Sequence, residues 1–150
     1  MPLDDDLKTL VRLPVFAVLE PEALKLIAFT AETRTYRAGD LLFRQGDLSD
    51  GGYVVVSGAV ALDSSQNAAT AGKILGPGAL LGEFALLVPT RCPATAIARQ
   101  STAVLKISRA MFLRTLEESP VSAIRLKRAL GRELEKLAKD LEKTRQSFLD

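Results

Sequence analysis

Short apolar runs separated by glycines fill the middle of the chain, from Arg34 to Ile107, and this pattern constrains the fold most strongly. Many short runs at regular spacing, with glycines at the breaks, are typical of strands in a β-barrel or sandwich. The small, polar stretch Ser64–Gly72 predicts an exposed hairpin loop between two of the strands. The predicted strands are Leu41–Phe43, Tyr53–Val56, Val60–Leu62, Ile74–Leu75, Leu80–Leu81, Ala94–Ala98 and Val104–Ile107.

Helical patterns precede this β block. Asp4 to Asp6 are expected to cap and charge the start of a short helix over roughly Leu7–Arg12, which Pro14 ends. A second helix is predicted to open at Glu20–Glu22, with Pro21 near its first turn. Its buried stripe is expected to consist of Leu24, Ile27 and Ala28.

Helical patterns also follow the β block. Arg109–Glu118 predicts one helix, broken by Ser119 and Pro120, and Val121–Phe148 predicts a long final helix. Helices, then strands, then helices indicate an α+β fold with segregated elements. We expect one domain over residues 1–119 and a C-terminal amphipathic helix over residues 120–150.

The complete lack of histidine limits the chemistry available to this chain. It excludes Ser-His-Asp and Cys-His catalysis, and it removes histidine-ligated metal sites. A single cysteine, Cys92, cannot form an internal disulfide or a structural zinc site. We therefore expect no enzyme activity, no metal and no cofactor.

Charge and hydropathy patterns bear on location and partners. The net charge of +2 gives no strong attraction to nucleic acid or membrane, and no run of 18 apolar residues is present. The acidic N-terminus lacks the features of a secretory signal, and the single free cysteine fits a reducing compartment. These features predict a cytoplasmic protein.

Three glycine-anchored motifs and one helical segment resemble the cyclic nucleotide-binding domain family, which includes catabolite activator protein. Their order along the chain matches the family, and together they cover about Leu13 to Phe112. The resemblance implies a double-stranded β-helix, or jelly-roll β-roll, with N-terminal helices and a long C-terminal helix, holding cAMP or cGMP. The matching segments are Leu13–Leu19, Tyr36–Asp47, Tyr53–Val60 and Leu75–Leu87.

The segment from Leu75 to Leu87 resembles the entry to the family's phosphate-binding cassette. The resemblance implies that backbone N–H groups of a short helix meet the cyclic phosphate, that Glu83 binds the ribose hydroxyl, and that an arginine pairs with the phosphate. The residue chemistry agrees, because Gly82 lets backbone approach an anion and a glutamate accepts strong hydrogen bonds from a sugar. The expected ligand-binding residues are Gly82, Glu83, Phe84, Ala85, Arg91, Cys92 and Thr95.

The end of the cassette departs from the family pattern, and two registers are open. Counted back from Thr95, the arginine position holds Cys92 and the next residue is Pro93, which has no N–H. Alternatively Arg91, the only cation between Lys73 and Arg99, takes the arginine role and the Cys92 N–H donates. Losing one charged hydrogen bond costs about 1.5–3 kcal/mol, roughly ten- to hundred-fold in affinity. We expect weak or absent binding of cAMP or cGMP, and the alternative is a degenerate domain that serves only as an interaction module.

The C-terminal helix carries a heptad seam made of Leu130, Leu134, Leu137 and Leu141. This seam predicts a homodimer, and repositioning of the helix would carry the signal to an effector protein. The alternative is that the early part of the helix, with Ile124, Leu126 and Leu130, folds over the roll and covers the pocket.

A basic cluster on the same helix predicts a solvated face rather than a nucleic-acid site. Nothing after Phe112 has the pattern of a helix-turn-helix, so we expect any output domain to belong to another chain. The cluster consists of Arg125, Lys127, Arg128 and Arg132.

Overall fold

Two four-stranded antiparallel sheets form the middle of the molecule in the computed structural model, which describes residues 2–63 and 72–149. One sheet has the strand order β1-β8-β3-β6 and the other has the order β2-β7-β4-β5. The predicted loop Ser64–Gly72 lies outside the described residues, apart from Gly72. The strands are β1 (Glu32–Tyr36), β2 (Leu41–Phe43), β3 (Gly51–Ser57), β4 (Val60–Asp63), β5 (Lys73–Leu75), β6 (Leu80–Leu81), β7 (Thr95–Ala98) and β8 (Thr102–Ser108).

The predicted strands are confirmed to within a few residues at each end, and the structure adds β1. Its sequence, Glu-Thr-Arg-Thr-Tyr, contains no apolar run, which is why the hydrophobic pattern did not reveal it. This strand lies at the edge of its sheet and pairs with β8, from Glu32 opposite Lys106 to Tyr36 opposite Thr102. An edge strand with one exposed face can be polar, because little of it contributes to the core.

Strand β8 separates two hydrophobic cores. Its residues alternate between the faces of the sheet, so Val104 faces the interior of the roll while Leu105 and Ile107 face the helices. The roll interior is filled by a small set of buried side chains from both sheets. They are Leu42, Tyr53, Val55, Val60, Leu81, Ala96, Ala98 and Val104.

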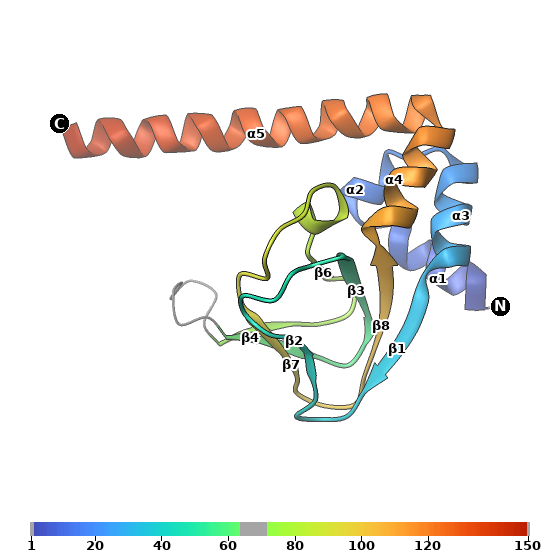
Figure 1. The fold of residues 1–150 in the computed structure, drawn as a ribbon. Coiled ribbons are helices and arrows are strands. Elements are labelled where there is room, and N and C mark those ends of the chain that lie inside the picture. Colours follow the sequence, from blue (N-terminus) through green and yellow to red (C-terminus); the bar gives the residue numbers. More distant parts are fainter. Residues whose placement is uncertain (1, 64–71, 150) are drawn as a thin grey trace.

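The first four helices gather on one side of the roll, beside β1 and β8, and the fifth runs from there across one end of the roll (Figure 1). Helix α3 begins at Pro21 as predicted, and Leu24, Ile27 and Ala28 are buried as expected. The first helix differs from the prediction, because it spans Pro2–Val11 and contains the three aspartates instead of starting after them. A proline at the first position and acids in the first turns both stabilise a helix start, which explains the earlier beginning. The helices are α1 (Pro2–Val11), α2 (Pro14–Ala17), α3 (Pro21–Thr30), α4 (Arg109–Glu118) and α5 (Pro120–Leu149).

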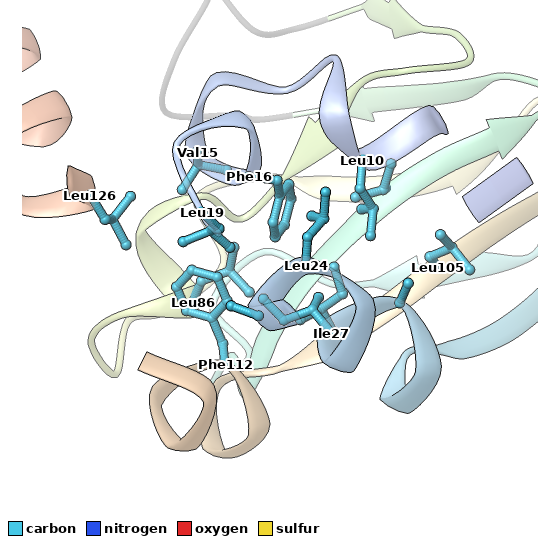
Figure 2. Close-up of a cluster of buried hydrophobic side chains, with 14 residues drawn as sticks. Leu10, Val15, Phe16, Leu19, Leu24, Ile27, Leu86, Leu105, Phe112 and Leu126 are labelled. Atoms are coloured by element: carbon cyan, nitrogen blue, oxygen red, sulfur yellow. The ribbon is translucent and has the colours of Figure 1, made fainter. Parts of the chain in front are cut away.

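The second core lies between these helices and the outer face of the β1-β8-β3-β6 sheet (Figure 2). Phe16, Phe112 and Leu10 are fully buried in it, and Ile27 is nearly so. Side chains from both ends of the chain therefore share one core, which explains why α4 lies among the N-terminal helices.

Helix α5 is anchored through its first turns. Leu126 is 2% exposed and packs into the helical core, and the Ser122 hydroxyl accepts a hydrogen bond from the Glu20 N–H at 2.9 Å. Ile124 is 53% exposed, so the expectation that it covers the roll is wrong. Beyond this anchor the helix runs on past the roll (Figure 1).

Candidate functional site

A cavity of about 740 Å³ opens into the interior of the roll. Its volume lies within the range of about 300–1,000 Å³ that small-molecule sites occupy. Strands β3 and β6, the turn after β6, and the chain segments around Ser49 and Arg91 form its walls. Among the described residues of α5 none lines this cavity, so α5 does not cover it in this structure.

The turn after β6 places four of the predicted residues on the cavity wall: Gly82, Glu83, Phe84 and Ala85. Gly82 has a φ of +83°, a left-handed conformation that favours glycine, and a Cβ there would lie 3.1 Å from the Gly51 carbonyl oxygen. This close approach lets the turn pack directly on β3. A short 3₁₀ helix, η1 (Phe84–Leu86), follows; within it Ala85 is buried and Phe84 is 54% exposed.

The end of the cassette pairs with the chain before β3 like a short strand. The Cys92 N–H donates to the Asp47 carbonyl at 2.8 Å, and the Gly46 N–H donates to the Cys92 carbonyl at 2.8 Å. The second register needs the Cys92 N–H for the ligand, whereas in this structure that N–H is hydrogen-bonded within the protein. The pairing through the Leu48–Arg91 bridge is the physical reason, because it uses the backbone donor within the protein.

Arg91 lies on the cavity wall, with an exposed side chain. Its Nη1 donates a hydrogen bond to the Gly46 carbonyl at 2.9 Å. The guanidinium has further N–H groups, so this bond leaves donors for an anion. The structure thus brings Arg91 and Cys92 to the same cavity as the turn at Gly82, and their roles toward a ligand stay predictions.

Thr95 is the predicted site residue that lies elsewhere. Within the described part of the chain it is not among the residues that line the cavity. Its Oγ1 accepts a hydrogen bond from the Gln45 N–H at 2.9 Å, which ties the start of β7 to the turn after β2. Thr95 thus makes a structural hydrogen bond beside the cavity residue Ala94, and its role toward a ligand stays a prediction.

Lys106 is a cavity residue that the sequence reasoning missed. It lies on the inward face of β8, is 6% exposed, and pairs with the Asp50 carboxylate. Its Nζ also lies 3.4 Å from the Tyr53 hydroxyl and 4.4 Å from the centre of that ring. The alternation of Thr102, Val104 and Lys106 along β8 could have indicated this position, because every second residue of a strand shares a face.

Two titrating groups at the cavity have shifted pKa values. The hydrogen bond from Lys106 holds the pKa of Asp50 below its ordinary value, because it favours the charged carboxylate. Burial raises the pKa of the Cys92 thiol, and the nearby negative charge of Asp47 raises it further by a smaller amount. Cys92 is therefore mostly protonated near neutral pH.

No group of three or more histidine, cysteine, aspartate or glutamate residues within 2–63 and 72–149 is placed to hold a metal ion. No helix in the described part of the chain is long and apolar enough to span a membrane.

Comparison with known proteins points to one family. The model of the "Cyclic nucleotide-binding domain" family matches residues 33–119. The cyclic AMP receptor protein of Thermus thermophilus is 35% identical over 90% of this chain, which spans 62% of that protein's length. Lysophospholipase nte1 of Aspergillus fumigatus is 29% identical, over 78% of this chain and 8% of the enzyme. A solved structure, a cyclic nucleotide-binding-like protein from Brucella abortus, is 40% identical with a TM-score of 0.69, covering 76% of this chain and 99% of that chain.

Proposed function

Because this chain belongs to the cyclic nucleotide-binding domain family, we propose that it is a regulatory module whose cavity binds cAMP or cGMP weakly and which has no enzyme activity of its own. The observation that supports binding is the cavity of about 740 Å³, whose wall combines the turn at Gly82 with Arg91. A glutamate, backbone donors and a guanidinium are the groups that a ribose with a cyclic phosphate needs.

Weak rather than tight binding is proposed because the cassette end offers few donors. The Cys92 N–H is already bonded to Asp47, and Pro93 has no N–H. The loss of one charge-assisted hydrogen bond lowers the affinity by roughly ten- to hundred-fold. Arg91 remains as the cassette cation that faces the cavity.

Calorimetric titration with cAMP and cGMP tests this proposal. We expect binding to the wild-type chain and a loss of ten- to hundred-fold in affinity for Arg91→Ala, because a charged hydrogen bond is removed. Arg99→Ala is the matched control, since Arg99 is an exposed arginine between β7 and β8 that is not among the cavity residues. Absence of binding by both nucleotides, or an unchanged affinity for Arg91→Ala, would contradict the proposal.

A second candidate function is homodimerisation through α5, from which an effector protein would receive the signal. The supporting observation is that this 30-residue helix is anchored near Leu126 and extends past the roll. Leu130 packs partly against the helical core, whereas the side chains of Leu134, Leu137 and Leu141 lie outside the described residues. Their heptad spacing is thus evidence from the sequence alone.

Light scattering on two chains tests the dimer. A chain ending after Arg132 keeps the buried Leu126 and the partly buried Leu130, so its helical core stays complete. We expect a dimer mass for the full chain and a monomer mass for the shortened one. A dimer mass for both chains would exclude the seam as the interface.

A further inference from the structure

Lys106 is a cation held inside the roll. Its side chain projects from the inward face of β8 into the cavity, and only 6% of the residue is exposed. Lysine is seldom this buried without a partner, because removing its charge from water is unfavourable. Here the Asp50 carboxylate and the Tyr53 ring and hydroxyl supply that compensation.

The two members of this ion pair differ strongly in exposure. The Asp50 side chain is 77% exposed, whereas the Lys106 side chain is 6% exposed. A solvated carboxylate gives up little when it leaves its partner, since water replaces the lost interaction. A buried ammonium must keep an anion nearby. The lysine is therefore fixed, and its counter-ion is the exchangeable member.

The charges that face the cavity are balanced without a ligand. The described lining includes three acidic and three basic side chains. An entering anion meets repulsion from the carboxylates unless one of them gives up its place beside a cation. Asp50 is suited to this because its largely exposed carboxylate already pairs with the buried Lys106. The charged lining residues are Asp47, Asp50, Glu83, Lys73, Arg91 and Lys106.

We propose that Lys106 binds the anionic group of the ligand inside the roll, and that Asp50 is a built-in counter-ion that this group displaces. The inference rests on the proposed function in one respect: it takes the anion to be the phosphate of a cyclic nucleotide. It gives the cavity a cation outside the cassette, which replaces part of the interaction lost at Cys92 and Pro93. It also makes Asp50 a residue that weakens binding by competing for Lys106.

Substitutions at the two residues should act in opposite directions on affinity. Asp50→Asn removes the competing charge and should tighten cAMP or cGMP binding by about two- to fivefold, as expected for an exposed pair. Lys106→Met keeps the stem but removes the charge, and it should weaken binding by roughly ten- to hundred-fold. Lys106→Arg retains a cation and should stay nearer the wild type than Lys106→Met. Unchanged or weaker binding by Asp50→Asn overturns the proposal. This test does not alter a buried residue, because the Asp50 side chain is largely exposed.

The single cysteine provides a second measurement. Cys92 lines the same cavity, so the ratio of its alkylation rates with and without an anion reports occupancy in each variant. The anions are cAMP, cGMP, inorganic phosphate and pyrophosphate. Circular dichroism of Lys106→Met checks that the variant is folded, and Asp50→Asn carries the test if it is not.

The outcomes separate this inference from the proposed function. Protection by cyclic nucleotides that is equal in wild type and Lys106→Met overturns the role of Lys106 alone. Protection by phosphate or pyrophosphate that requires Lys106, with none by cAMP or cGMP, overturns the proposed function alone. Lack of protection by all four anions overturns both.

Discussion

The rings of Phe16 and Phe112 meet edge to face, with centroids 5.9 Å apart and planes at 89°. Both side chains are fully buried. An edge-to-face aromatic pair stabilises the folded state by more than the burial of its surface area alone accounts for. The contact joins α2, near the start of the chain, to α4, which follows the last strand. It therefore sets the position from which α5 begins, because only Ser119 separates α4 from α5.

The anchor of α5 can be tested with two apolar residues on one helix. Leu126→Ala removes a side chain that is 2% exposed and should lower the free energy of unfolding by about 2–5 kcal/mol. Ile124→Ala, at a residue 53% exposed, should change it by no more than about 0.5 kcal/mol. Urea unfolding measures both, and equal losses would show that the helix packs on a different face.

Much of the fold could be predicted because its signals are local. Glycine-bounded apolar runs located β2 and β4, and proline with acidic residues located the start of α3. Strand β1 has no such signal, since its place is decided by pairing with β8 along the sheet edge. The start of α1 was also misplaced, because aspartates stabilise a helix both as caps and within its first turns.

The cassette wall was predictable up to its last residues. The turn at Gly82 follows from a short motif, and the structure places it on the cavity. The role of the Cys92 N–H depends on pairing with Asp47, which lies 45 residues earlier and which no local pattern reveals. Lys106 was missed for a similar reason, because its partner Asp50 comes from a distant segment of the chain.

Replacing Gly82 and Gly131 by alanine should change the stability of the chain in opposite directions. Gly82→Ala places a Cβ on a residue with a φ of +83° and 3.1 Å from a carbonyl oxygen, so we expect a loss of about 1–2 kcal/mol or more. Gly131 lies within α5 with open space around it, and Gly131→Ala should stabilise the chain by about 0.5–1 kcal/mol. Chemical denaturation distinguishes the two, and a neutral Gly82→Ala would show that the turn relaxes freely.

The Cys92 thiol should react slowly with iodoacetamide near neutral pH. Burial and the charge of Asp47 raise its pKa above the ordinary 9.0, and the thiolate is the reactive form. We expect the midpoint of the pH–rate profile to lie above pH 9.0 in wild type and to fall in Asp47→Asn, which keeps an oxygen to accept the Arg44 N–H. A midpoint that does not move in Asp47→Asn would show that the charge of Asp47 does not contribute to the raised pKa of the thiol.

The ion pair of Asp50 and Lys106 should make stability depend on pH in the acid range. Lys106 holds the pKa of Asp50 below its ordinary value of 3.8, so the folded state binds the proton of this group less readily than the unfolded chain. The stabilisation is therefore complete above about pH 4 and is lost as the pH falls through the folded pKa.

We expect the difference in unfolding free energy between wild type and Asp50→Asn to be constant from pH 7 to pH 5 and to shrink below pH 4. The same substitution in a Lys106→Met background should show a smaller acid dependence, because the hydrogen bond that shifts the pKa has been removed. Urea unfolding of the four chains at pH 3, 4, 5 and 7 completes this double-mutant cycle. An acid dependence that is the same in both backgrounds would mean that other groups set the titration of Asp50, and that Lys106 is held in the roll chiefly by Tyr53.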